Sequence, residues 1–262
     1  MSVKGAVIGD IIGAQYEFSR PRDLDWEKCP LIEDPRFLYF TDDTVMTLAI
    51  KKAILEKADL VQTMVEIGRR YPNSGYGGQF YRWITTDDHS PYGSWGNGSA
   101  MRVSYVGEYY DDFDIMQAKA AETAAVSHND IEGIKGAVVT ATCIWMVRQG
   151  KSKEEVYRYV LDQYPSDGYK FSICRSLDEI RDEYVWSVSC MDTVPVAFRC
   201  FYESKDYESF MRNIFSLDCD SDTFGAVAGS AVEEYYGGFG NIDAEKILED
   251  VLTADLKEIL NQ

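Results

Sequence analysis

Apolar residues recur along most of this 262-residue chain at the spacing of an α-helix. In the clearest run, the side chains fall at relative positions i, i+3, i+4, i+7 and i+8 and so share one helical face: Met46, Ala49, Ile50, Ala53 and Ile54. The same periodicity appears in residues 134–145, 224–235 and 244–252. Each of these segments is therefore predicted to be an amphipathic helix.

The residues at the ends of these segments also favour helices. Gly150 and the pair Gly237-Gly238 are typical of helix stops, and Asp243 is a suitable N-cap for the last segment. Ser152 precedes the acidic pair Glu154-Glu155, which predicts one more helix start.

Strand signals are few and short. Residues 185–188 and 194–196 are rich in valine, but no Asn-Gly turn joins two alternating segments. The sequence also contains no internal repeat and no Pro/Ser-rich linker. We therefore predict an all-α fold, a compact helical bundle, with a single domain that spans residues 1–262.

Three glycines near the start of the chain recur at every fourth position: Gly5, Gly9 and Gly13. On a helix this spacing forms a strip without side chains, which a neighbouring helix can approach closely. The same spacing occurs in membrane helix dimers, but this segment is short and contains Asp10. We therefore predict a helix contact inside the core of a soluble protein.

The net charge is −18, from 44 acidic and 26 basic residues. Such a surface repels nucleic acid and anionic membranes, and no Lys/Arg cluster offsets it. The chain has no apolar run of membrane-spanning length, and residues 1–18 lack a signal-peptide cleavage pattern. We expect a cytoplasmic protein that binds neither nucleic acid nor membranes, and that needs a metal ion or backbone N–H groups to hold an anion.

Two acidic segments directly precede predicted helices. They are Thr41-Asp42-Asp43-Thr44 and Asp220-Ser221-Asp222-Thr223. A helix start favours one acid through its free N–H groups and its dipole, whereas a second acid nearby adds repulsion. If the two helices pack together, the carboxylates and hydroxyls would form a set of oxygen donors suited to Mg²⁺, Mn²⁺ or Ca²⁺. The same residues also suit acidic N-caps that face water, and the pattern alone leaves both interpretations open.

Two glycine-rich segments are candidate phosphate-binding loops. They are residues 75–78 and 96–99, whose flexible backbone can turn N–H groups toward an anion. Neither matches the P-loop or the dinucleotide fingerprint. His128, one of only two histidines, lies just before a predicted helix start and is a candidate ligand contact. Each of these features also fits an ordinary structural role.

Taken in chain order, these segments resemble the ADP-ribosylglycohydrolase family, the group that includes dinitrogenase reductase-activating glycohydrolase. The resemblance extends from about residue 4 to about residue 236. The matching stretches are Gly9–Glu17, Phe40–Thr44, Gly75–Gly77, Gly96–Arg102, Ser127–His128 and Asp220–Thr223.

The resemblance implies an all-α domain with a centre of two Mg²⁺ or Mn²⁺ ions. Such a centre would cleave the glycosidic bond of an ADP-ribosylated protein or small molecule, with arginine-linked targets favoured, and would release ADP-ribose. By the family pattern, the metal ligands would be Thr41, Asp42, Asp43, Asp220, Asp222 and Thr223.

The resemblance also implies roles at the reacting bond and around the ligand. Asp42, Asp43 and Asp222 would be catalytic, and Glu17 would match the family's mobile acid beside the metal centre. Taken alone, Glu17 also fits a surface position. The expected ADP-ribose contacts are Gly77, Gly98, Ser99 and His128.

One departure from the family pattern concerns the residues before the second acidic segment. Many members carry Gly-Gly there, whereas this chain has Asp218-Cys219. An added carboxylate would act as a hydrogen-bond acceptor near the metal ligands or change the metal preference. It also leaves open an ADP-ribose-binding module with little or no hydrolase activity. A third interpretation, a helical protein whose acids are only caps, predicts no binding of divalent cations.

Overall fold

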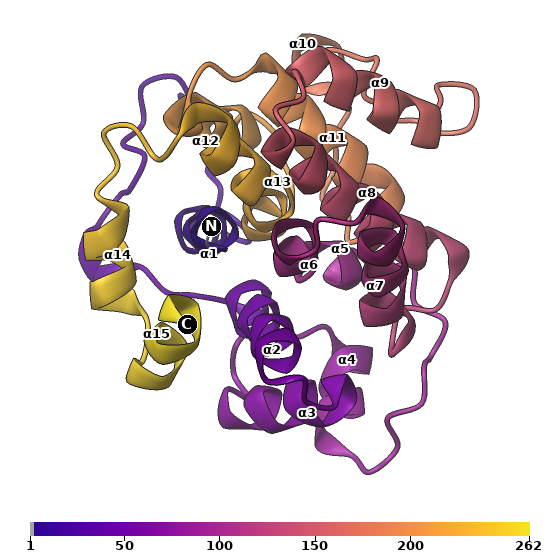
Figure 1. Cartoon of the computed structure of the whole chain (residues 1–262). Coiled ribbons are helices and arrows are strands. Elements are labelled where there is room, and N and C mark those ends of the chain that lie inside the picture. The colour runs from indigo at the N-terminus through magenta and orange to yellow at the C-terminus, as the bar shows by residue number, and fades with distance from the viewer. Residues whose placement is uncertain (1–2) are drawn as a thin grey trace.

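The computed structural model describes residues 3–262, and every regular element within this range is a helix (Figure 1). Residues 1 and 2, which belong to the segment without a signal-peptide cleavage pattern, lie outside the described range. The predicted all-α class is therefore confirmed. The elements are α1 (Lys4–Gly13), η1 (Pro35–Phe37), α2 (Asp42–Glu56), α3 (Leu60–Arg70), α4 (Gly78–Thr85), α5 (Gly98–Met101), α6 (Ser104–Tyr109), α7 (Phe113–Ala125), α8 (Ile131–Arg148), α9 (Lys153–Gln163), α10 (Leu177–Ile180), α11 (Cys190–Glu203), α12 (Tyr207–Phe215), α13 (Ser221–Tyr236), α14 (Ala244–Val251) and α15 (Ala254–Asn261).

The predicted helix ends are confirmed where capping residues define them. Ser152 and Glu155 form a reciprocal capping box at the start of α9, and the Asp243 side chain accepts from the first turn of α14. Gly150 and Gly237 have φ values of 74° and 73°, which are favourable for glycine just after a helix. Local sequence therefore determines where these helices begin and end.

The two valine-rich strand signals do not form strands. Residues 194–196 lie inside α11, and residues 185–188 are irregular. The only β-type pairing among residues 3–262 is an isolated antiparallel bridge between Gly96 and Ser189. The preference of valine for strands is weak, and the burial of Val194 and Val196 on different sides of α11 overrides it.

Helices α1 and α13 lie against each other with backbone touching backbone. Figure 1 looks along α1, which lies near the centre of the molecule with α13 beside it. A Cβ atom added to Gly9 would overlap the backbone of Gly225, and one added to Gly5 would overlap that of Gly229. The glycine strip predicted from the sequence is therefore a close helix contact in the core.

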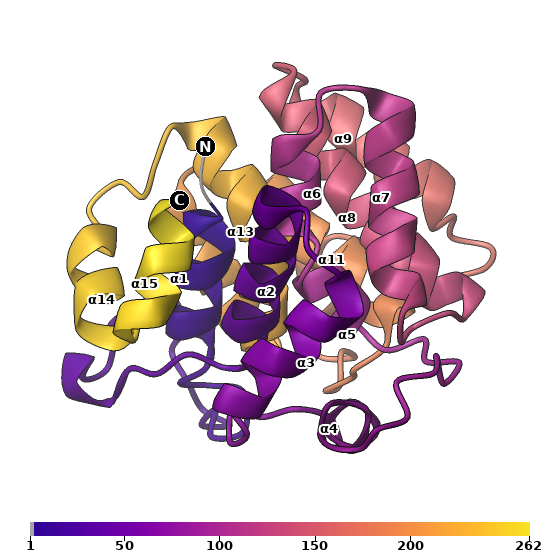
Figure 2. The same cartoon turned by 60° about the horizontal axis from the view of Figure 1, so that its bottom comes forward.

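This contact brings distant parts of the sequence together. Gly5 faces Gly229, whereas Gly13 faces the backbone of Ser221 and Asp222, so the two helices run antiparallel. The end of α1 consequently lies beside the start of α13. Figure 2 shows α1, α2 and α13 side by side, with α4 and the loop after α1 gathered at one end of them.

Replacing Gly9 by Ala is expected to lower the free energy of unfolding by about 3 kcal/mol, because the added methyl group must push the two helices apart. Denaturant unfolding measures this change. Gly168→Ala is the matched control, since its Cβ would meet nothing closer than the carbonyl oxygen of Pro165 at 3.9 Å. Equal destabilisation by the two substitutions would contradict the close contact.

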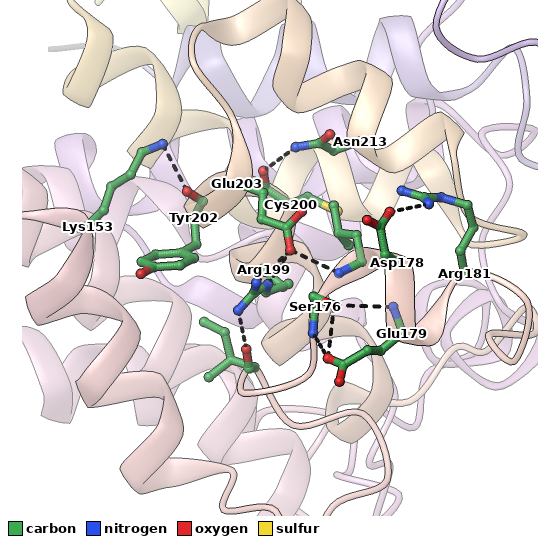
Figure 3. Close-up of polar contacts among 12 residues, drawn as sticks. Lys153, Ser176, Asp178, Glu179, Arg181, Arg199, Cys200, Tyr202, Glu203 and Asn213 are labelled. Carbon is green, nitrogen blue, oxygen red and sulfur yellow. Dashed lines mark hydrogen bonds and ion pairs between the residues drawn. The ribbon is translucent and has the colours of Figure 1, made fainter.

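Helix α11 is held at both ends. Near its C-terminus, Asn213 of α12 donates to the Cys200 carbonyl (2.9 Å), and Lys153 of α9 donates to the Tyr202 carbonyl (3.3 Å; Figure 3). At its N-terminus, the thiol of Cys190 lies 3.2 Å from the carbonyl oxygen of Gly96. Helices α9 and α12 thus contact α11, and α11 in turn contacts the loop of residues 96–98 through Cys190.

Within residues 3–262, no helix combines the length and the apolar character that crossing a membrane requires.

Candidate metal centre and ligand cleft

A cleft of about 430 Å³ opens where the starts of α2 and α13 meet the loop after α1. Both acidic segments, both glycine-rich segments and His128 contribute to its walls. Of the predicted site residues, Thr41 and Ser99 do not line it. Those that do are Glu17, Asp42, Asp43, Gly77, Gly98, His128, Asp220, Asp222 and Thr223.

The first acidic segment is held in place by Asp10 of α1. This carboxylate is fully buried and accepts from the backbone N–H groups of Thr41 (3.1 Å) and Thr44 (3.0 Å). It also accepts from the hydroxyls of both threonines, at 2.8 Å for Thr41. Asp10 therefore fixes the start of α2 with charge-assisted hydrogen bonds.

Asp43 of the first acidic segment contacts the second. Its Oδ2 atom lies 3.2 Å from the hydroxyl of Thr41 and 3.4 Å from the hydroxyl of Thr223. Its Oδ1 atom is buried and has no hydrogen-bond partner among the described residues. A buried carboxylate oxygen without a partner is costly, so this atom points to a missing positive ligand.

The second acidic segment is held by Asn97. The Asn97 side chain donates to Oδ2 of Asp220 (2.8 Å) and to the hydroxyl of Thr193 (3.1 Å). The backbone N–H of Thr223 donates to Oδ1 of Asp222 (2.8 Å). Both acids are at least 96% buried at the start of α13, where the helix dipole favours negative charge.

Glu17 follows α1 and reaches the second acidic segment. One oxygen atom each of Glu17, Asp220 and Asp222 lie within 4.8 Å of one another. Burial, followed by the charge of Asp222, raises the pKa of Glu17 to about 9. Beside it, Phe18 and Trp186 bring their rings to 6.0 Å across the mouth of the cleft.

The other acids of the cleft have raised pKa values as well. Burial raises the pKa of Asp10 and of Asp220 to about 6. Burial and then the charge of Asp222 raise the pKa of Asp42 and of Asp43 well above the usual range. For Asp222 the causes are burial and then Asp220. These carboxylates therefore favour a proton or a cation between them.

The donor set fits a hard divalent cation. Its side chains offer carboxylate and hydroxyl oxygens, which Mg²⁺ and Mn²⁺ prefer over nitrogen or sulfur. The unpartnered Oδ1 of Asp43 and the approach of Glu17 to Asp220 and Asp222 support the same conclusion. The interpretation of the acids as water-facing caps does not fit the burial of Asp43, Asp220 and Asp222.

The glycine-rich segments line the cleft with backbone. Cβ atoms added to Gly77 and Gly78 would meet no atom within 4 Å, so this wall is open to a ligand. Opposite it, Gly98 faces His128, whose Nε2 lies 3.0 Å from the position of an added Cβ. The Ser99 hydroxyl instead donates to the carbonyl of Gly133 (2.7 Å) and holds the loop against α8.

Three polar residues that support the site were not predicted from the sequence to have a role in it. Asp10 and Asn97 hold the two acidic segments, and Arg102 is a fully buried arginine in the cleft wall. All three lie inside stretches that carry the family resemblance. The only local signal was a charged or amide side chain in an otherwise apolar or glycine-rich segment.

The family assignment rests on the extent of the sequence match. The family model described as ADP-ribosylglycohydrolase matches residues 2–249. The chain belongs to this family. The resemblance given by the short motifs is thereby confirmed, and membership supports hydrolysis of an ADP-ribosyl linkage in general terms.

Individual relatives agree with the family assignment. The mouse protein named ADP-ribosylhydrolase ARH3 is 26% identical over 303 aligned positions, which cover 89% of this chain and 82% of that protein. Its human counterpart is 25% identical, with 89% and 84% covered. A solved structure titled "ADP-ribosylglycohydrolase-related protein complex" superimposes with a TM-score of 0.76 at 22% identity and covers 99% of this chain and 93% of its own. That structure shares the fold.

The departure from the family pattern lies outside the cleft of this family member. Asp218 is exposed and does not line the cleft, and the buried thiol of Cys219 lies 3.6 Å from the carbonyl oxygen of Ile214. The structure therefore gives no support to the interpretation of Asp218 as a hydrogen-bond acceptor for the metal ligands.

Proposed function

We propose that the protein is a metal-dependent hydrolase that removes ADP-ribose from a mono-ADP-ribosylated target, with arginine-linked targets favoured. The observation that carries the proposal is the convergence of two distant acidic segments, two glycine-rich segments and His128 on one cleft. Neither acidic caps nor a simple surface turn requires that convergence.

Two Mg²⁺ or Mn²⁺ ions would be held by the carboxylates and hydroxyls of the two acidic segments. When bound, the ions supply positive charge and Lewis acidity. Asp10 and Asn97 would keep these ligands in position through the hydrogen bonds described above. The proposed metal ligands are Thr41, Asp42, Asp43, Asp220, Asp222 and Thr223.

The diphosphate of ADP-ribose would lie against the glycine-rich walls. Helix α4 begins at Gly78, and the N–H groups of its first turn suit phosphate oxygens. Gly98 and His128 would hold the ligand from the other side. In a protein with a net charge of −18, such local donors are needed to hold an anion.

Glu17 is placed to hold a proton next to the acidic cluster. Its raised pKa of about 9 keeps the carboxyl group protonated at neutral pH in the metal-free protein. From this position, Glu17 would hold or release a proton beside the acidic cluster. It would thereby act as the acid or base for the departing or attacking group.

A panel of ADP-ribosylated substrates tests the proposal. Peptides modified on arginine or on serine, and a small-molecule adduct, are incubated with Mg²⁺, with Mn²⁺ or with chelator, and released ADP-ribose is measured. We expect release from the arginine-linked peptide with either metal and none in chelator. Calorimetric binding of ADP-ribose without turnover of any substrate would instead support a binding module.

A further inference from the structure

Arg102, which follows α5, is buried beside the cleft and only partly paired. Its side chain is 0% exposed, and one guanidinium nitrogen donates to the carbonyl of Thr123 (3.0 Å) and to the hydroxyl of Ser127 (2.8 Å). The other two nitrogens have no hydrogen-bond partner among the described residues, and the guanidinium lies 5.2 Å from the centre of the Phe80 ring. Burying a guanidinium with two unpartnered nitrogen atoms is costly. Such a cost points to a role of Arg102 in its contact with Ser127.

The contact with Arg102 determines how the Ser127 hydroxyl is used. A guanidinium can only donate, so the Oγ of Ser127 must accept from it. Ser127 is 0% exposed, and its own proton needs an acceptor. The other hydrogen-bonding atom next to this hydroxyl in the described part of the chain is Nδ1 of His128, at 2.8 Å. The hydroxyl therefore donates to Nδ1, which carries no proton.

The second ring nitrogen of His128 faces the cleft. Nε2 lies 3.0 Å from the position of an added Cβ at Gly98 and 3.5 Å from that at Gly96. The ring is packed between Phe80 and Tyr92, with centroids at 6.2 and 5.6 Å. Burial, and then the charge of Arg102, hold the pKa of His128 well below its usual value. A neutral ring with a bare Nδ1 carries its proton on Nε2.

We propose that Arg102 is a positioning residue that acts through Ser127 to fix His128 as the Nε2–H tautomer. The cleft then presents a neutral hydrogen-bond donor beside Gly98 for an oxygen atom of the ligand. The tautomer is a property of this chain alone, whereas the identity of the ligand as ADP-ribose rests on the proposed function.

The tautomer is tested by NMR of protein labelled with ¹⁵N on histidine. With two histidines in the chain, His89→Gln assigns the signals of His128. We expect ring couplings of an Nε2–H tautomer in the wild-type protein, and their loss or mixing in Ser127→Ala and Arg102→Met. Ser230→Ala is the matched control, because it removes a buried hydroxyl of α13 that lies outside the cleft. An Nδ1–H tautomer in the wild-type protein would overturn the proposal.

Calorimetry with ADP-ribose tests the use of the donor. Ser127→Ala is expected to weaken binding about tenfold, the cost of a misdirected hydrogen bond to a charged group. His128→Gln, whose amide can place a donor near the position of Nε2, is expected to bind more tightly than His128→Asn, whose amide lies near the position of Nδ1. Equal affinities of the two variants would overturn the role of Nε2–H.

The two experiments separate failure of this inference from failure of the proposed function. If the wild-type protein does not bind ADP-ribose but Ser127→Ala alters the tautomer, the proposed ligand is wrong and the positioning by Arg102 stands. The opposite result is that the wild-type protein binds ADP-ribose and hydrolyses an ADP-ribosylated substrate, but Ser127→Ala leaves the tautomer unchanged. In that case the positioning by Arg102 is wrong and the proposed function stands.

Discussion

Replacing Asp222 by Asn is expected to lower the rate of ADP-ribose release at least about a hundredfold, measured on a substrate that the wild-type protein cleaves. Loss of residues that only orient metal ligands typically costs ten- to a hundredfold, so loss of a ligand costs at least as much. Asp222 lies within 4.8 Å of Glu17 and Asp220, and its charge contributes to the raised pKa of Asp42 and Asp43. One substitution therefore disturbs both halves of the site. Steady-state rates with saturating Mg²⁺ or Mn²⁺ measure the effect.

Asp218→Asn is the matched control, because it removes the same charge four residues earlier at an exposed position. It is expected to leave the rate within about twofold of wild type, as for other surface substitutions. Thermal unfolding in chelator separates loss of catalysis from loss of folding. Since Asp222 is a repelled, buried acid, Asp222→Asn is expected to be at least as stable as wild type without metal. Full activity of Asp222→Asn would remove this residue from the proposed site.

In chelator, the melting temperature is expected to fall as the pH rises from about 5 to about 8. The acids of the cleft have folded pKa values raised above their unfolded values, to about 6 for Asp10 and Asp220 and to about 9 for Glu17. Their contribution to stability is fully present below the unfolded pKa, near 4, and is lost as the pH rises through the folded pKa. For Asp10 the full shift corresponds to about 3 kcal/mol, of which about half is lost above pH 5. In a chain of this size, that half amounts to roughly 3–6 °C.

Mg²⁺ or Mn²⁺ is expected to raise the melting temperature most at the upper end of this pH range. A cation between the carboxylates replaces the protons that they lose, so binding strengthens as the pH rises. Differential scanning fluorimetry at pH 5 and pH 8, with metal or with chelator, gives the four values needed. A melting temperature at pH 8 that does not respond to either metal would support the interpretation of the acids as simple caps.

The helices were predictable because their signals are local. Periodic apolar positions, the cap Asp243 and the stops Gly150 and Gly237 act within one or two turns, and the structure confirms each of them. The valine-rich residues 194–196 misled because strand preference is weak compared with burial on a helix. The outcome there depended on what α11 packs against, which the local sequence does not contain.

The sequence predicted the motifs of the candidate site but not the residues that hold these motifs in place. The two acidic segments were expected to meet if their helices packed together, and they line one cleft. The roles of Asp10 and Asn97 could not be read from the sequence, because their partners lie 31 and 123 positions away. Ser99 shows the converse, since it belongs to a recognised motif but its hydroxyl bonds to α8.

The glycine contact between α1 and α13 fixes how the two helices are aligned along their length, and thereby the distance between the site residues at their ends. Because the glycines repeat every four residues, the helices can interlock again only after a slide of four residues, roughly 6 Å. A slide of that size would carry Asp222 away from Glu17 and Asp43. Insertion of a single residue into either helix would rotate its glycines by about 100° and remove the contact altogether. The helix pair therefore tolerates no insertion or deletion in this region. We expect related proteins to change the cleft through its loops and not through this part of α1 and α13.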